Sequence, residues 1–481
     1  MDINQLLALA PIMTLATASL ALMLSIAGKR NFVFACSVAA GGILLTLFAL
    51  TIAWPKTPLQ ATLLIRVDHY ALSFMALLLL AGLAVLGLCY DYFKDRAGQN
   101  EELLLLLLTA LLGASVLVVS SHFATFLMGI ETLSISLFVL IGYPLKQPRP
   151  LEAAIKYLIL SGVSSAFLLM GMALIYAQCG ELYFSGIGHF IANQTAINTL
   201  VLSGIILIVA GLGFKLSLVP FHLWTPDVYE GAPAPITAFI ATVSKGAVFV
   251  LLLRFFISAD SFVYAPLLNI FSIIAVLSIL AGNLLALLQN NVKRLLAYSA
   301  IAHIGYLLVA FIAGNSIAPH LAIESVSFYL VAYFITTIGA FGVVSLLSTA
   351  QTEADDLYFY RGLFWRQPGL AGIFTLMLLS LAGIPLTVGF IGKFYIFTSG
   401  AEGRLWGLLA TVIIGSGLGL YYYLRIIVVM SMPAQETAIE GKQPDRAWIS
   451  TTTLSVLAML LVWFGIYPDF LVNLIHSVAY M

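Results

Sequence analysis

Residues 211–235 read GLGFKLSLVPFHLWTPDVYEGAPAP, and they continue an apolar run, NTLVLSGIILIVA, at residues 198–210. The run is long enough to cross a membrane, which takes a helix of about 20 residues. Yet the stretch contains Lys215 and His222, and between them lies Pro220, which interrupts a helix because proline has no amide hydrogen to donate. The stretch therefore predicts a broken membrane helix with ionisable groups at the break.

The composition of the whole chain is that of a polytopic membrane protein. Of its 481 residues, 62% are hydrophobic and only 9% are charged, whereas soluble domains carry about 25% charged residues. Only helices and closed barrels satisfy backbone groups in lipid, and barrels alternate polar and apolar residues, so we expect an all-α fold without a sheet. The formal net charge of zero provides no basic face for nucleic acid. The cysteines, Cys36, Cys89 and Cys179, form no CxxC and have no metal-ligand spacing.

The apolar runs predict about fourteen transmembrane helices. The first run lacks a basic start, and Lys29 and Arg30 follow it, so it indicates a first membrane helix rather than a signal peptide. The predicted spans are residues 4–27, 32–54, 69–90, 103–119, 122–142, 152–178, 197–224, 236–257, 266–289, 294–314, 321–348, 369–398, 404–430 and 448–474.

The basic residues of the loops predict the orientation of the spans. Of the 21 lysines and arginines, three lie in one set of loops: Lys56, Arg66 and Arg404. Twelve lie in the alternate set: Lys29, Arg30, Lys94, Arg96, Lys146, Arg149, Lys293, Arg294, Arg361, Arg366, Lys442 and Arg446. By the positive-inside rule, the second set faces the inside and both chain ends face the outside.

Four charged residues lie where a span crosses the membrane: Glu131 in the fifth span, Lys215 in the seventh, Lys245 in the eighth and Lys393 in the twelfth. Such a group costs several kcal/mol unless it is paired or hydrated, so each is a candidate functional residue. A purely structural buried pair is weakly favoured in energy. We predict that these four residues transfer protons, with Glu131 as the carboxylate that faces Lys215.

Two histidines leave alternatives open. His303, at the centre of the tenth span, is either a proton-transfer group or a hydrogen-bonded core histidine. His222, toward the inner mouth, either supplies protons to Lys215 or caps the broken segment, and histidine titrates near neutral pH when it is unperturbed.

Four further charged residues have local explanations. Arg254, near the outer end of its span, is expected to reach the interface by snorkelling. Arg425 is expected to anchor the inner end of its span. Glu152 and Lys156 are four residues apart, which predicts an ion pair on one helix face.

The two spans that contain Lys215 and Lys393 share an interruption. Pro220 follows the first lysine and Pro385 precedes the second. Two broken helices in corresponding places of two halves indicate a transporter built from inverted repeats. We therefore predict three helices in residues 1–100, a five-helix repeat (helices 4–8) in 101–260, a second, inverted repeat (helices 9–13) in 261–432, and an inside loop with helix 14 in 433–481.

Three stretches resemble the signatures of one family: residues 211–235, NVKRLLAYSAIAHIGYLL at 291–308 and LAGIPLTVGFIGKFYIF at 381–397. They are similar to the antiporter-like subunits of respiratory complex I, the bacterial proton-pumping NADH:quinone oxidoreductase. The chain most resembles the branch with a lysine at position 393, where M-type members have glutamate, and without the long lateral helix of L-type members. The resemblance implies proton transfer by Glu131, Lys215, Lys245 and Lys393, with His303 as a link between the halves.

The resemblance also implies partners and a cellular place. NADH, FMN, iron–sulfur clusters and quinone are expected in partner subunits, with no cofactor held by this chain. The expected neighbours are other membrane subunits of the complex, including an M-type subunit and small membrane subunits, in the bilayer of the bacterial inner membrane. The implied function is proton translocation coupled to electron transfer from NADH to quinone.

Two alternatives to this function remain. The same charges suit a subunit of an Mrp-type cation/proton antiporter, which exchanges ions without redox input. A passive subunit that only anchors an assembly is the other alternative, but an inert anchor does not need four buried charges.

Overall fold

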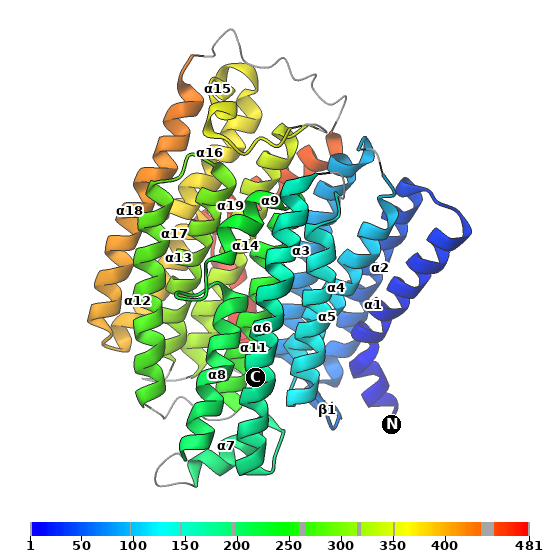
Figure 1. Cartoon of the computed structure of the whole chain (residues 1–481), viewed down its shortest axis with the longest axis vertical. Helices are drawn as coiled ribbons and strands as arrows, with labels where there is room; N and C mark the ends of the chain where they lie inside the picture. Colours follow the sequence, from blue (N-terminus) through cyan, green and yellow to red (C-terminus); the bar gives the residue numbers. More distant parts are fainter. Residues whose placement is uncertain are drawn as a thin grey trace.

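The computed structural model describes residues 2–96, 98–144, 147–193, 198–258, 265–314, 319–349, 352–433 and 447–479. Long helices run side by side through these residues (Figure 1), and thirteen of them are long and apolar enough to cross a membrane. The predicted twelfth span is divided between two shorter helices, α16 (Pro368–Ala382) and α17 (Val388–Glu402). The predicted all-helical membrane fold is therefore confirmed.

The first part of the chain contains an element that the sequence did not predict. An antiparallel hairpin, β1 (Leu59–Thr62) and β2 (Ile65–Val67), follows the short helix η1 (Trp54–Lys56). The expectation of no sheet is wrong here, because the hairpin lies in a connection where the backbone does not have to cross lipid. The long helices of this part are α1 (Ile3–Gly28), α2 (Phe32–Ala53), α3 (His69–Lys94), α4 (Glu101–Val119), α5 (Phe123–Ile141) and α6 (Pro148–Cys179).

The predicted seventh span ends early. Its helix stops at Leu216 because Ser217 adopts a left-handed conformation (φ 63°), and its amide donates to the carbonyl oxygens of Gly213 and Phe214. The elements of this part are α7 (Phe184–Ala192), α8 (Thr199–Leu216), α9 (Trp224–Gly231), α10 (Ala234–Phe239), the π-helical segment η2 (Ile240–Ser244), α11 (Lys245–Ser258), α12 (Ala265–Leu287), α13 (Val292–Ala313) and α14 (Pro319–Leu347).

The last predicted span, residues 448–474, is two helices. Pro468 lies between them, and the residue before a proline is pushed out of the helical conformation; Tyr467 accordingly has φ −122° and ψ 74°. The remaining elements are η4 (Leu357–Tyr360), α15 (Leu363–Arg366), α18 (Trp406–Ser431), α19 (Trp448–Ile466) and α20 (Asp469–Ala479).

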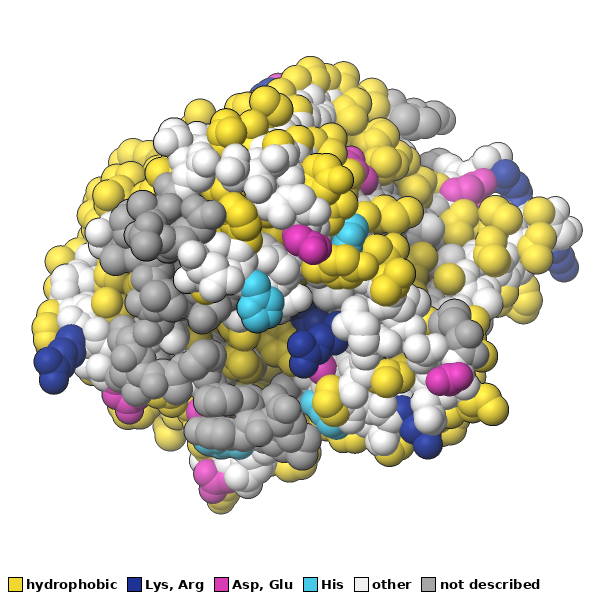
Figure 2. Space-filling view, turned by 90° about the horizontal axis from the view of Figure 1, so that it is seen from below, with side chains coloured by type: hydrophobic (Ala, Val, Ile, Leu, Met, Phe, Trp, Pro, Cys, Tyr) yellow, Lys and Arg dark blue, Asp and Glu magenta, His cyan; other side chains and the backbone are white. Residues whose placement is uncertain are grey.

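The basic loops meet at one end of the bundle. We call it the basic end, defined by three close contacts between a basic and an acidic side chain that join its loops: Arg30–Glu102 at 2.8 Å, Arg149–Asp355 at 3.4 Å and Arg96–Glu353 at 3.5 Å. This end, with α15, is uppermost in Figure 1, and the hairpin is at the foot. Seen from below, the opposite end shows scattered charges among hydrophobic side chains (Figure 2). The inside-loop residues Lys146, Lys442 and Arg446 lie outside the described residues.

Two glycines bring the helices with the candidate residues close to their neighbours. A Cβ atom on Gly113 of α4 would lie 2.6 Å from the amide nitrogen of Leu133 in α5. A Cβ atom on Gly282 of α12 would lie 2.7 Å from the amide nitrogen of Ala302 in α13. Small residues allow this close packing, which stabilises helix pairs in lipid, and it fixes the positions of α5 and α13.

Candidate functional site

Lys215 lies buried in the last turn of α8. Its Nζ donates to the hydroxyl of Ser134 in α5 at 2.5 Å and to that of Ser161 in α6 at 2.6 Å. The end of α8 adds the partial negative charge of its unpaired carbonyl groups, which favours a cation. The helix break and two hydroxyls from neighbouring helices therefore make a polar site for this ammonium inside the bundle.

Glu131 does not pair directly with Lys215. Its carboxylate, on α5, accepts a hydrogen bond from Ser165, which lies one helical turn from Ser161 on α6. Among the described residues no ion pair within 4 Å joins Glu131 and Lys215. The ammonium reaches Ser134, three residues further along α5, rather than the carboxylate. The link between the two charges runs through serines.

Lys245 begins α11, directly after the π-helical segment η2, and its exposed fraction is 1%. Its Nζ has no hydrogen-bond partner among the described residues and lies 5.2 Å from the ring centre of Tyr229. The hydroxyls of Tyr229 and Tyr333 are also buried without a partner there. Buried polar groups of this kind are usually satisfied by ordered water, so this region suits a hydrated connection.

His303, on α13, is held by two tyrosines. The hydroxyl of Tyr329 in α14 lies 2.7 Å from Nδ1, and that of Tyr423 in α18 lies 3.3 Å from Nε2. Ser299 is hydrogen-bonded to the same Tyr423 hydroxyl. His303 is thus a buried histidine held by hydrogen bonds. The hydroxyls that hold it can also transfer protons.

Lys393, on α17, reaches back across the break between α16 and α17. Its Nζ donates to the carbonyl oxygen of Ala382, the last residue of α16, at 2.8 Å. A cavity of about 10 Å³ is lined by both His303 and Lys393, which is room for about one water molecule. The structure therefore brings these two predicted residues to one small cavity.

His222 lies in the connection between α8 and α9, buried, with Nδ1 unpartnered among the described residues. Its backbone carbonyl accepts from the amide of Thr225 at 3.0 Å. The start of α9 has no side-chain cap, so the imidazole does not cap this helix, and the two alternatives for His222, proton donor or cap of the broken segment, stay predictions.

Two other predicted charged groups form ion pairs. Arg254 has an exposed fraction of 5% and pairs with Asp68 at the start of α3, so the expected snorkelling is wrong: the guanidinium is satisfied inside the protein. Lys156 pairs with Glu152 at 2.7 Å, as expected, and also with Asp227 of α9 at 2.8 Å.

Arg425, whose anchoring at the inner interface stays a prediction, forms hydrogen bonds to a neighbouring helix. It donates to the carbonyl oxygens of Leu287, at 3.2 Å, and Gln289. These oxygens lie at the end of α12, where unpaired carbonyl groups attract a cation. The arginine thus ties α18 to the end of α12.

The sequence interpretation missed the uncharged members of the site: Ser134, Ser161, Ser165, Tyr229, Tyr329, Tyr333 and Tyr423. The signal was present in the spacing of the serines. Ser134 is three residues from Glu131, and Ser161 and Ser165 are four residues apart, so each set lies on one face of a helix.

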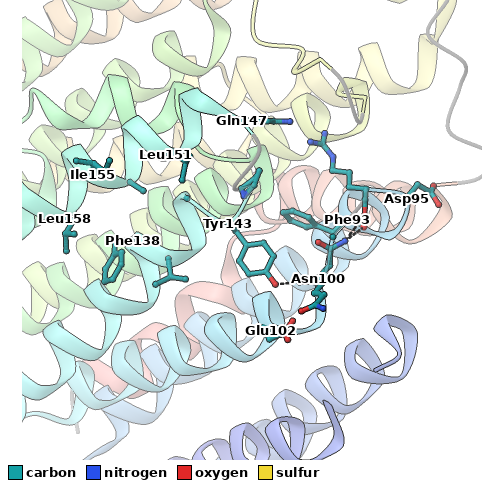
Figure 3. Close-up of a pocket in the computed structure, with 17 residues that line it drawn as sticks. Phe93, Asp95, Asn100, Glu102, Phe138, Tyr143, Gln147, Leu151, Ile155 and Leu158 are labelled. Atoms are coloured by element: carbon teal, nitrogen blue, oxygen red, sulfur yellow. Dashed lines mark hydrogen bonds between the residues drawn. The ribbon is translucent and has the colours of Figure 1, made fainter. Parts of the chain in front are cut away.

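A larger cavity lies apart from these residues. It has a volume of about 960 Å³ and opens at the basic end among α3, α4, α5 and α6. Apolar side chains such as Phe138 and Leu158 lie on one side and polar ones such as Asn100 and Glu102 on the other (Figure 3). None of the six predicted site residues lines it.

The fold and the row of buried lysines define an antiporter-like membrane protein, with two broken helices and no soluble domain in its described part. The pattern of one family, described as the NADH:quinone oxidoreductase/Mrp antiporter transmembrane family, matches residues 120–419. The chain belongs to this family.

Known relatives refine the position of the chain in the family. It is 50% identical to NADH-quinone oxidoreductase subunit N of Methylococcus capsulatus over 98% of this chain and 95% of the relative. A chain of respiratory complex I from Thermus thermophilus is 32% identical, with a TM-score of 0.81, and the match covers 96% of this chain and 98% of that one. A chain of the Mrp complex from a Dietzia species has a TM-score of 0.83 at 17% identity, and the match covers 100% of this chain and 97% of that one. It shares the fold.

Proposed function

We propose that this chain is a proton-translocating membrane subunit, of the subunit N type, of an NADH:quinone oxidoreductase. Electron transfer from NADH to quinone in partner subunits drives proton movement through it. The observation that carries the proposal is that Lys215, Lys245 and Lys393 are placed inside a membrane bundle at or beside breaks in regular α-helix. The relationship to subunit N over nearly the whole chain supports the redox coupling.

In the proposed route a proton enters near α8 and α11, with His222 as a donor, and loads Lys215. It passes by Lys245 and bound water toward His303 and Lys393. Glu131 acts as the switch, because a nearby carboxylate favours the ammonium form of a lysine and burial favours the neutral amine. When the Glu131 carboxylate moves toward a neighbouring subunit, Lys215 loses that stabilisation and releases its proton.

The surroundings follow from the same proposal. NADH, FMN, iron–sulfur clusters and quinone are held by partner subunits, and the neighbours are an M-type subunit and small membrane subunits. The protein lies in the bacterial inner membrane with its basic end inside and both chain ends outside, which the distribution of basic residues supports. Residues 101–260 and 261–432 form two inverted repeats, each with one broken helix.

A single purification tests the function against its alternative, an Mrp-type cation/proton antiporter. The tagged chain is isolated from its own membranes and reconstituted in vesicles with everything that accompanies it. We expect a complex that oxidises NADH with quinone and takes up protons as it does so. Recovery with antiporter subunits that exchange Na⁺ for protons, without NADH oxidation, overturns the proposal.

A further inference from the structure

A carboxylate at the basic end is not used by the route above. Glu353 lies in the connection between α14 and η4, where it accepts a hydrogen bond from the hydroxyl of Tyr92. Its carboxylate lies 3.4 Å from the Nζ of Lys293, 3.4 Å from the hydroxyl of Ser348 and 3.5 Å from the guanidinium of Arg96. Its side chain is 21% exposed, so the carboxylate contacts both the surface and the interior.

Lys293 continues this contact inward. Its side chain has an exposed fraction of 0%, and its Nζ donates to the carbonyl oxygen of Ala232 at 2.6 Å. The hydroxyl oxygen of Thr237 lies 3.4 Å from this carbonyl oxygen, 3.3 Å from that of Tyr229 and 3.2 Å from that of Pro233, so these carbonyls surround one hydroxyl. Polar groups therefore lead from the surface at Glu353 to Tyr229, whose ring is next to the buried Lys245.

Titratable groups from several elements surround Glu353 and its partner Lys293. They are Tyr92 on α3, Arg96 after α3, Arg149 on α6, Glu230 on α9, Asp355 in the same connection and Tyr360 on η4. Burial first, and then the negative charge of Asp355, raise the pKa of Glu353 to about 8. A carboxyl group with such a pKa holds its proton at neutral pH and gives it up readily, as a proton carrier requires.

We propose that Glu353 is a proton-collecting residue that passes protons from water at the basic end through Lys293 to Lys245. The inference rests on the proposed function, because Lys245 is its acceptor. In each cycle the carboxylate binds one proton from water. It then gives that proton to the neutral amine of Lys293 and is left as a carboxylate. Lys293 passes the proton inward and returns to the amine.

The test compares variants of two neighbouring acids in the intact complex. Glu353→Gln keeps the size of the side chain but cannot exchange a proton, and Glu353→Asp keeps a carboxyl group. The matched control is Asp356→Asn, because Asp356 is exposed and accepts from the amide of Tyr358, a role that asparagine can retain. NADH-driven proton uptake and NADH oxidation are measured across neutral and alkaline pH in vesicles, after subunit content has been confirmed.

We expect Glu353→Gln to lower proton uptake roughly tenfold, which is less than the 10²–10⁴-fold that a positioned proton-transfer group typically contributes. It should also remove the decline in activity that deprotonation near pH 8 causes in the unchanged protein. Glu353→Asp should restore part of the rate and a pH-dependent decline, and Asp356→Asn should change neither. If Glu353→Gln fails to assemble, the pH profile of Glu353→Asp is the test. Activity that declines at the same pH as in the unchanged protein overturns the proposal, and activity that declines at a different pH supports it.

Lys245→Met, measured alongside, separates the two proposals. Loss of proton uptake in Lys245→Met with an unchanged rate and pH profile in Glu353→Gln overturns the role of Glu353 and leaves the proposed function in place. Unchanged proton uptake in both variants overturns the proposed route itself. A slower Glu353→Gln complex with an unchanged pH profile identifies a structural residue and also overturns the inference.

Discussion

The two broken helices place a lysine in similar surroundings by different means. α8 ends because Ser217 is left-handed, and Lys215 lies in the last turn of that helix. α16 ends because Gly383 is left-handed (φ 84°), and Lys393 reaches back from the next helix to its last carbonyl. Both ammonium groups thus lie at the carboxyl end of a half-helix, where the helix dipole favours a positive charge.

The partners of the two lysines differ in a way that bears on function. Lys215 is bound by two hydroxyls, and Glu131 lies behind them through Ser165. Lys393 is bound by a backbone carbonyl, and among the described residues no carboxylate lies within ion-pair distance of it. Hydroxyls and a carboxylate can rearrange, whereas the carbonyl of a packed helix is fixed. We infer that Lys215 is the switched site and Lys393 the site that only relays.

The largest effect is expected from Lys215→Ala. Alanine cannot hold a proton, and the serines around it have no proton to exchange near neutral pH, so proton uptake should fall at least about tenfold. Assembly should be retained, because the hydroxyls left behind can bind water. Proton uptake and NADH oxidation are measured in vesicles of equal subunit content. Unchanged proton pumping in an assembled Lys215→Ala complex would refute the central role of this lysine.

Lys393 is the next strongest test, because two replacements separate a relay from an electrostatic anchor. Arginine can still donate to the carbonyl of Ala382, but it does not release a proton in this pH range, so Lys393→Arg should impair pumping. A glutamate can still carry a proton, so Lys393→Glu should retain more activity. An anchor predicts the reverse order. Pumping rates at equal assembly decide, and higher activity in the arginine variant contradicts the relay.

Glu131 should respond to loss of charge more than to loss of length. Glu131→Gln keeps the size and can still accept from Ser165, but it has no charge to switch, so turnover should slow or lose its coupling to protons. Glu131→Asp loses one methylene group and should be milder. The measurement is the ratio of protons taken up to NADH oxidised. Near-normal ratios in both variants would show that charge at this position is irrelevant.

The sequence predicted the lysines well and their contacts poorly, for a physical reason. A charge in a run of apolar residues is conspicuous, because hydrocarbon does not solvate it, and this alone located Lys215, Lys245 and Lys393. Which groups touch a charge depends on how helices are rotated and packed. That is why the sequence indicated Glu131 as the carboxylate at the Lys215 site but missed the serines between the two groups.

Long-range pairs were equally hidden. Arg254 pairs with Asp68, which is 186 residues away in the sequence, and nothing near either residue indicates the other. Helix ends were predicted only approximately because the break after Lys215 depends on the left-handed conformation of Ser217, which lies before the proline that signalled it. Composition and periodicity therefore determine the architecture, and side-chain packing determines the site.

The smallest effect is expected from the serines of α6, and it tests the difference between the two broken helices directly. Ser161 accepts from the ammonium of Lys215, whereas Ser164 donates to the carbonyl oxygen of Gly211 at 2.9 Å. Both are buried on the same helix, three residues apart, so Ser164→Ala is a matched control for Ser161→Ala.

A hydrogen bond to a charged group contributes about 1.5–3 kcal/mol, but Ser134 still binds the ammonium and water can replace part of the loss. Ser161→Ala should therefore lower proton uptake only several-fold, and Ser164→Ala should leave it nearly unchanged. Equal proton uptake in the two variants would mean that the hydroxyl contact does not matter to Lys215. The acceptor of Lys393 is a backbone carbonyl, so no side-chain substitution can remove it. In this sense the Lys393 site is fixed, whereas the Lys215 site can be switched.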